Sequence, residues 1–312
     1  MLTALILLVL GGLTAAMAPR ILARSSWPDR EPVLALWVWQ CVVVAVLLCA
    51  VLAMALAGSA AWNSVREHLF APAPSRVVEA YSLRPDGQLW AAAVAVLLAC
   101  GGLWSAWMLL GEVRTSRARR RRRRDGLLSR SPRLPGEGPS SGDRLVIVED
   151  DRPDAWLLSG PPEQLVISTG ALRRLKGRQL DAVLAHEQGH ARARHDWLLH
   201  CSGALARGFP RVPVFAAFRE QVHRLTEMAA DDAASRRFGR LTTALALVGL
   251  NEDRGVFGPC PGQAHVPVRV HRLLAPAGRM SVPRRLHTTA VAALVPAVPL
   301  LVAFAPGLTA LR

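Results

Sequence analysis

Four apolar segments of at least 17 residues stand out along the chain, and none of them contains Asp, Glu, Lys or Arg. This is about the length that a helix needs to cross the hydrocarbon core of a bilayer. The segments are residues 2–18, 33–57, 89–110 and 289–305. The pattern predicts a multi-pass membrane protein with four transmembrane helices, and Pro296 and Pro299 are expected to kink the last one.

The first segment also has a feature of a signal peptide, because Ala16, Met17 and Ala18 have the small-x-small form of a cleavage site. No basic residue precedes the apolar run, however, and Pro19 follows at the position of cleavage. We therefore expect this segment to remain in the protein as a transmembrane helix.

Arginines near the segment ends predict the orientation, because cytoplasmic loops carry an excess of basic residues. They cluster between the first two segments, after the third and before the fourth, and these places share one side if the amino terminus is outside. We expect a plasma membrane protein in which residues 59–88 face the exterior and the chain from about Glu112 to Leu286 is cytoplasmic.

A run of arginines from Arg119 to Arg124 begins within a few residues of the third segment. A juxtamembrane position favours contact with anionic lipid of the inner leaflet, so we expect lipid rather than nucleic acid as its partner. The net charge of +15 is carried almost wholly by arginine, which indicates codon bias more than nucleic acid binding. Five cysteines, an odd number without paired spacing, argue against a disulfide scaffold.

Pro, Gly and Ser dominate residues 129–143, which predicts a flexible linker. Together the patterns divide the chain into four regions. We expect three transmembrane helices in residues 1–111, a polybasic juxtamembrane segment and linker in 112–143, a cytoplasmic domain in 144–286 and a fourth transmembrane helix in 287–312.

The expected cytoplasmic domain combines a small sheet with helices. Alternating β-branched residues predict strands from Arg144 to Asp150 and from Glu163 to Leu172. From Gly177 onward apolar residues recur every three or four positions, and no proline occurs before Pro210, so a helix is predicted there.

This helix carries the sequence HEQGH, in which His186 and His190 are four residues apart. Residues at this spacing lie on one helix face, so the two imidazoles can bind one Zn²⁺ while Glu187 lies beside its water. With 9 histidines in 312 residues, such a motif arises by chance in roughly 1% of chains of this composition. A catalytic zinc also needs a third protein ligand.

A second helix, in HRLTEMAADDAASRRFG, offers Glu227 as that ligand. Its alanines would let it approach the first helix closely, and Asp231 lies one turn further on the same face, where it can hydrogen-bond a ligand histidine. The alternative is that Glu227 is a surface carboxylate that pairs with Arg224.

The motifs HEQGH and EMAAD together resemble those of gluzincin membrane proteases, which include HtpX-like and CAAX prenyl proteases. Three helices, a cytoplasmic zinc domain and a fourth helix look closer to the BlaR/MecR-type antirepressor metallopeptidases. The chemistry and the resemblance together imply an α+β zinc domain in a mainly α protein, with one Zn²⁺ held by His186, His190 and Glu227. Glu187 is the expected general base, and we group Asp231 with it in the catalytic set.

BlaR/MecR sensors carry an external penicillin-binding domain after the last helix, whereas this sequence stops at Arg312, so we expect it to resemble the sensorless members. We expect a regulatory protease that cleaves a cytoplasmic protein such as a transcriptional repressor. The alternatives are an HtpX-like quality-control protease and a zinc-stabilised scaffold without turnover. An intact Glu187 argues against the scaffold.

Some roles stay open at this stage. His195, His200, His223 and Arg269 are the candidates for stabilising the oxyanion, and Asp196 is expected to cap or orient a helix. The strand in EQLVIST, residues 163–169, is the candidate edge onto which a substrate backbone adds.

Overall fold

The computed structural model of the chain is mostly helical and describes nine stretches of residues. These are residues 2–71, 73–81, 88–128, 145–151, 153, 155–158, 164–251, 266–275 and 278–311. The linker expected at residues 129–143 lies outside them, as do Arg144 and Glu163 at the starts of the two predicted strands.

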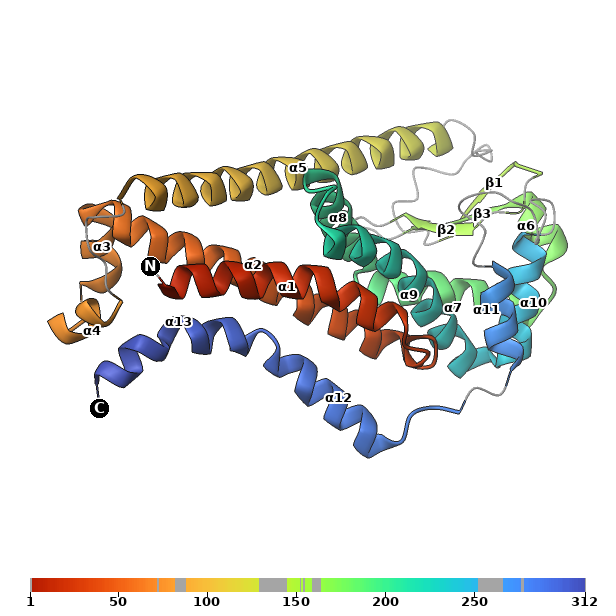
Figure 1. Ribbon diagram of the computed structural model, residues 1–312. Coiled ribbons are helices and arrows are strands. Elements are labelled where there is room, and N and C mark those ends of the chain that lie inside the picture. The colour runs from red at the N-terminus through yellow and green to blue at the C-terminus, as the bar shows by residue number, and fades with distance from the viewer. Residues whose placement is uncertain are drawn as a thin grey trace.

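Long apolar helices form one part of the molecule (Figure 1). Three helices are long and apolar enough to cross a membrane, namely α1 (Leu2–Ala23), α2 (Pro32–Ala61) and, within α5 (Gln88–Leu128), Leu89–Thr115. Helices α12 (Val282–Leu294) and α13 (Ala297–Ala310) are bent by 46° at the break between them, and together they would make a fourth span. Pro296 lies in this break, as the sequence suggests.

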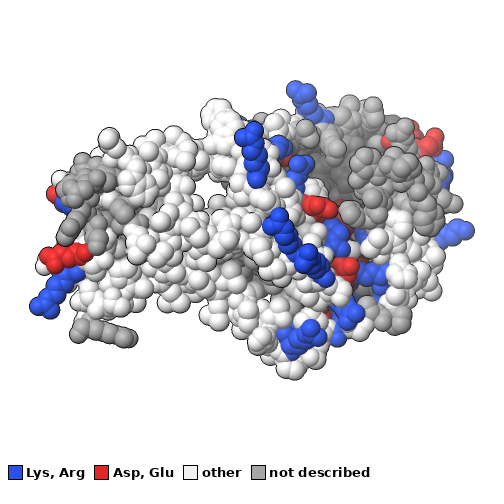
Figure 2. Space-filling model, in the orientation of Figure 1, with Lys and Arg blue, Asp and Glu red and all other residues white. Residues whose placement is uncertain are grey.

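Helix α2 packs between α1 and α5. At Gly11 of α1 the approach is close, because a Cβ atom there would lie only 2.9 Å from the Cβ atom of Cys49. In Figure 2 the charged side chains gather toward the two ends of the face shown, and a broad zone without them lies between. This distribution fits helices that pass through hydrocarbon.

Helix α5 is longer than the predicted span, because it continues past Leu110 to Leu128. Arginine is a good helix former, so the run from Arg119 to Arg124 extends the helix instead of ending it. Two short helices, α3 (Asn63–Phe70) and α4 (Ser75–Ala80), lie between α2 and α5 in the chain. They are at the end of the long helices that is distant from the sheet (Figure 1).

The sheet has three strands where the sequence predicted two. Strand β1 (Leu145–Val148) pairs parallel with β3 (Gln164–Ser168), and β2 (Ala155–Leu158) pairs antiparallel with β3. The order is therefore β1-β3-β2. The expectation that residues 163–169 form an edge strand is wrong, because β3 has a neighbour on each side. The edges among the described strands are β1 and β2.

The second predicted strand also ends earlier than expected. At Ser168 the hydroxyl accepts a hydrogen bond of 3.0 Å from the backbone N–H of Ala171, which caps helix α6 (Thr169–Arg174). The residues up to Leu172 are thus helical.

Between α6 and α12 the described part of the chain forms five further helices. They are α7 (Arg178–Arg192), α8 (His195–Gly208), α9 (Pro213–Phe238), α10 (Arg240–Asn251) and α11 (Val266–Leu274), with η1 (Trp27–Asp29) placed earlier, between α1 and α2. Helix α9 joins the two parts of the molecule, since Phe218 and Leu225 share a buried cluster with Trp39 of α2. The tip of the α8–α9 hairpin meets α5, where the indole N–H of Trp104 donates a 3.0 Å hydrogen bond to the carbonyl of Gly208.

Candidate metal centre

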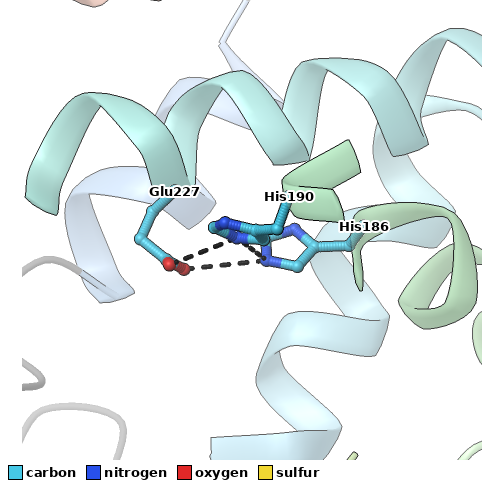
Figure 3. Close-up of side chains that lie close together, drawn as sticks. All are labelled: His186, His190 and Glu227. Atoms are coloured by element: carbon cyan, nitrogen blue, oxygen red, sulfur yellow. Dashed lines mark hydrogen bonds and ion pairs between the residues drawn. The ribbon is translucent and has the colours of Figure 1, made fainter. Parts of the chain in front are cut away.

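Two histidines of α7 and one glutamate of α9 come together between these helices (Figure 3). The Nε2 atoms of His186 and His190 are 3.2 Å apart. The Oε2 atom of Glu227 lies 3.6 Å from Nε2 of His186, and its Oε1 atom lies 3.3 Å from Nε2 of His190.

These distances fit a shared metal ion. A tetrahedral Zn²⁺ binds histidine nitrogen and carboxylate oxygen at about 2.0–2.2 Å, which puts neighbouring donors about 3.3–3.5 Å apart. Two imidazoles and one carboxylate are also the donor set of a known class of catalytic zinc sites, in which a fourth position stays open. The three side chains are half-buried rather than fully exposed.

Close packing of α7 and α9 produces this geometry. A Cβ atom at Gly189 would lie 3.3 Å from the Cβ atom of Ala233 and 3.4 Å from the Cα atom of Ala230. Helix α7 also packs against the sheet, because its residues Ala182 and Val183 are buried in one cluster with Ile167 of β3. The alanines and Gly189 therefore let the two helices approach closely enough for their side chains to share one ion.

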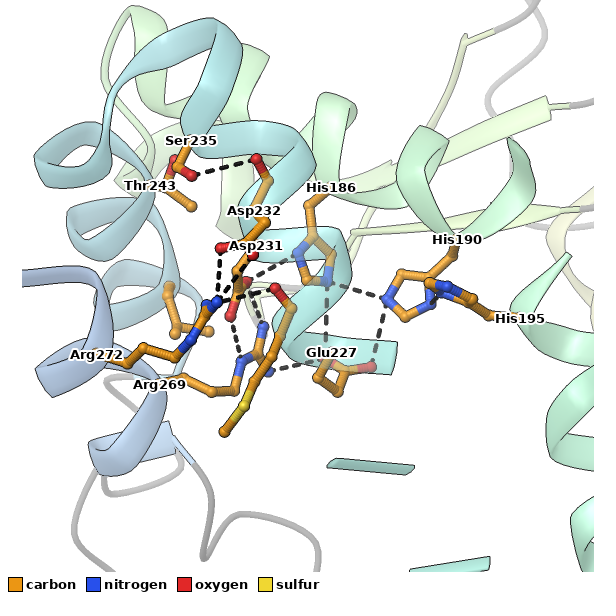
Figure 4. Close-up of polar contacts among 12 residues, drawn as sticks. His186, His190, His195, Glu227, Asp231, Asp232, Ser235, Thr243, Arg269 and Arg272 are labelled. Atoms are coloured by element: carbon orange, nitrogen blue, oxygen red, sulfur yellow. Dashed lines mark hydrogen bonds and ion pairs between the residues drawn. The ribbon is translucent and has the colours of Figure 1, made fainter. Parts of the chain in front are cut away.

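Around the three donors lies a second group of polar contacts (Figure 4). Asp231, which is only 1% exposed, places its Oδ1 atom 3.0 Å from Nδ1 of His186. Arg269 of α11 donates two hydrogen bonds of 2.7 Å to Asp231, and its Nη1 atom lies 2.8 Å from Oε2 of Glu227. One guanidinium thus fixes both carboxylates of α9.

His195 occupies the corresponding place behind His190. Its Nδ1 atom lies 3.0 Å from Nδ1 of His190, and the side chain is only 5% exposed. A histidine that binds a metal through Nε2 carries its proton on Nδ1, so His190 can donate to His195. Both candidate ligand histidines therefore have a partner at the nitrogen that faces away from the metal.

Electrostatics favour ionised carboxylates at the centre. Burial alone would raise the pKa of Glu227, but the hydrogen bond with His186 and the charge of Arg269 outweigh it and hold this pKa at about 2. Burial likewise opposes ionisation of Asp231, and the hydrogen bonds and charge of Arg269 keep its pKa well below the usual range.

The two histidines differ from each other in the metal-free protein. Burial would lower the pKa of His186, but hydrogen bonds to Asp231 and Glu227 outweigh this and raise it to about 9. Burial lowers the pKa of His190 to about 4, because the attraction of Glu227 does not compensate for it. In the absence of metal the protonated imidazole of His186 thus lies between the two carboxylates, with Nδ1 toward Asp231 and Nε2 toward Glu227.

Glu187 points toward the same space. It is half-buried and, with His186 and Glu227, lines a cavity of about 190 Å³. Apolar residues of α7 and α10, among them Val183 and Leu247, form one part of its wall, and Asp231 and Arg269 belong to the polar part. A carboxylate, two imidazoles and an open cavity give room for a peptide bond next to the proposed ion.

The candidates for the oxyanion role lie in different places. Arg269 is engaged by the carboxylates of α9, and His195 is engaged by His190. His200 lies on α8, where its Nδ1 atom is 3.9 Å from Glu112 of α5, and His223 is exposed and lines no part of the cavity among the described residues. Only Arg269 of the four is among the residues that line this cavity.

The alternative partner of Glu227 is engaged elsewhere, because the guanidinium of Arg224 contacts Asp29 and Gln221. One smaller expectation differs from the structure. Asp196 does not cap α8, because the N-cap is Arg194, in a left-handed conformation with φ 51°. Asp196 instead lies in the first turn of α8, where a carboxylate stabilises the amino end of a helix.

Sequence reasoning missed the contacts of Asp232 and Arg272. The guanidinium of Arg272 lies 2.8 Å from Asp232 and also donates to the carbonyl of Asp29, in the connection between α1 and α2. The only local signals are two adjacent aspartates in α9 and two arginines three residues apart in α11. The sequence does not show that these two helices meet.

Comparison with known proteins gives one match. Residues 130–249 match the model of Peptidase family M48, which comprises zinc metallopeptidases. The matched region contains the sheet and all three proposed metal ligands, and it ends before α11. Neither a search of curated proteins nor one of solved structures found a match. The match and the apolar helices together support a membrane metalloprotease.

Proposed function

We propose that the protein is an integral-membrane zinc endopeptidase. His186, His190 and Glu227 hold the metal, and Glu187 is the general base. The observation that supports this most is the set of donor distances of 3.2, 3.3 and 3.6 Å beside a cavity that Glu187 also lines. A scaffold role has less support, because a purely structural zinc site has four protein ligands and no use for the carboxylate of Glu187.

Each side chain then has a distinct task. When bound, zinc supplies Lewis acidity to the scissile carbonyl and to water. Glu187 takes the proton from the attacking water and passes it to the leaving amine, so hydrolysis proceeds without an acyl-enzyme. Asp231 accepts a hydrogen bond from the Nδ1–H of His186, which leaves the Nε2 lone pair of His186 for the metal. Arg269 keeps Asp231 and Glu227 ionised and oriented. Asp231 and Arg269 are therefore positioning residues.

The substrate is proposed to be a cytoplasmic or membrane protein, and in the regulatory version it is a transcriptional repressor. Two features support this proposal: the resemblance of the span arrangement to BlaR/MecR-type proteases, and the arginine distribution, from which we expect the domain to lie on the cytoplasmic side of the membrane. Membrane protein quality control is the alternative for the same chemistry.

One experiment addresses both the chemistry and the substrate. Newly formed protein amino termini are compared between cells that carry the wild-type chain and cells that carry Glu187→Gln. A general base typically contributes about 10²–10⁴-fold to a rate, so fragments made by this protease should disappear with the variant. One dominant repressor fragment would support regulation, whereas many fragments of misfolded membrane proteins would support quality control. Identical sets of termini would contradict protease activity.

A further inference from the structure

A second concave surface is lined by residues of α7 and α9 other than those that line the cavity of Glu187. It is a groove of about 520 Å³ between the first turns of α2 and the helices α7, α8 and α9. We call it the α2 groove. The residues on which its chemistry depends are Val33, Trp37, Arg192, His195, Leu198 and Arg236.

One wall of the groove is apolar and belongs to a membrane span. Val33 and Trp37 are 54% and 43% exposed, although both lie on the most apolar of the long helices. They are near the end of α2 that follows Arg30, so we expect this wall to lie at the boundary between hydrocarbon and water. Tryptophan is typical of that boundary. Leu198 of α8 continues the apolar surface.

The other side of the groove is cationic. Arg192 of α7 and Arg236 of α9 both line it and both are exposed. Among the described residues, Arg236 has no ion-pair partner, and the partner of Arg192 is the neutral amide of Gln188, at 3.4 Å. No carboxylate belongs to the described lining. Asp232, one turn before Arg236, is paired with Arg272.

An apolar wall at the membrane boundary and two unneutralised guanidinium groups opposite it suit an amphiphile with an anionic head. We propose that the α2 groove binds one anionic phospholipid of the leaflet next to the metal centre. Its phosphate lies between Arg192 and Arg236, and an acyl chain lies along Val33 and Trp37. Basic pockets beside transmembrane helices bind acidic lipid head groups by the same physics.

The groove is also connected to the proposed metal centre through the side chain of His195. His195 lines it, and the Nδ1 atom of His195 lies 3.0 Å from that of His190. A lipid in the groove would therefore cover the side of His195 that faces away from His190. The proposed binding site does not depend on the proposed protease activity.

The test measures lipid contact directly, in full-length Glu187→Gln protein in detergent micelles. Brominated phosphatidylglycerol and brominated phosphatidylcholine quench nearby tryptophans, and subtraction of the signal of a Trp37→Phe variant isolates Trp37. Each arginine near an anionic surface strengthens binding roughly fivefold, so Arg192→Gln with Arg236→Gln should weaken phosphatidylglycerol binding about 30-fold. Phosphatidylcholine binding should stay unchanged.

The matched control is Arg237→Gln with Arg240→Gln, which removes the same charge from exposed residues outside the groove. This control should keep the preference for phosphatidylglycerol. The proposal fails if both double variants lose the preference equally, or if the Glu187→Gln parent protein has none. It also fails if inorganic phosphate displaces the lipid at millimolar concentration, because the groove would then be a site for a free anion.

Discussion

Arg269 offers a test of how the candidate centre is held together. It is 8% exposed and donates two hydrogen bonds of 2.7 Å to Asp231, which is 1% exposed, while it also contacts Glu227 at 2.8 Å. The change Arg269→Met keeps much of the side-chain volume but removes the charge. Two carboxylates then remain beside each other without their shared cation.

The expected loss is large for a single substitution. Removal of one partner from a buried ion pair typically costs about 3–5 kcal/mol, because the other charge stays buried without compensation. For a chain of this size that corresponds to a fall in Tm of roughly 6–20 °C. Thermal unfolding of the zinc-free protein in detergent measures it. Arg240→Met, at an exposed position, serves as control and should change the stability by less than about 0.5 kcal/mol.

A double variant separates the ion pair from simple packing. If Arg269 acts through Asp231, the combination Arg269→Met with Asp231→Asn should be more stable than the sum of the single effects predicts, by about 1–3 kcal/mol. Strictly additive losses, or a loss below about 1 kcal/mol for Arg269→Met alone, would refute the reasoning.

The remaining predictions concern the neighbours of Arg269. Gly189→Val should lower the free energy of unfolding by about 1–3 kcal/mol, because the valine side chain would overlap Ala233. Thermal unfolding measures this loss, and Gly111→Val, at a position with open space around it, should not show it. His195→Phe should weaken zinc binding about 10–100-fold in a chelator competition assay, whereas equal affinity would show that the contact with His190 does not orient that ligand. The raised pKa of His186 stabilises the folded protein fully at pH values below 6.5, the ordinary pKa of histidine, and this stabilisation is lost as the pH rises through about 9. Zinc-free protein should therefore have a lower Tm at pH 10 than at pH 6. A Tm that stays constant or rises between these pH values would contradict this.

Local spacing explains why the sequence could point to the candidate ligands that the structure brings together. His186 and His190 are one helical turn apart, and the turn between Glu227 and Asp231 has the same spacing, so each pair is fixed by its own helix. The small residues that let the helices meet are likewise visible in the sequence, in Gly189 and the alanines of α9. No long-range information was needed for any of these.

Long-range pairing explains the errors. Arg269 and Asp231 are 38 residues apart, and the 14 residues that precede α11 have no pattern that predicts which way it docks. Strand β2 is absent from the sequence prediction, and its antiparallel pairing with β3, which local pattern does not reveal, decides that β3 lies in the centre of the sheet. The length of α5 was underestimated because hydropathy marks the end of the apolar surface, whereas arginines continue the helix.

The central claim is that His186, His190 and Glu227 hold a zinc ion and that Glu187, beside it, is the general base for the attacking water. The most direct measurement is zinc content and peptide hydrolysis of purified full-length protein, wild type beside Glu187→Gln, with a mixed peptide library as substrate. The account predicts one zinc per chain in both proteins and a loss of at least 100-fold in hydrolysis for the variant. Retained hydrolysis by a zinc-loaded Glu187→Gln protein would contradict it.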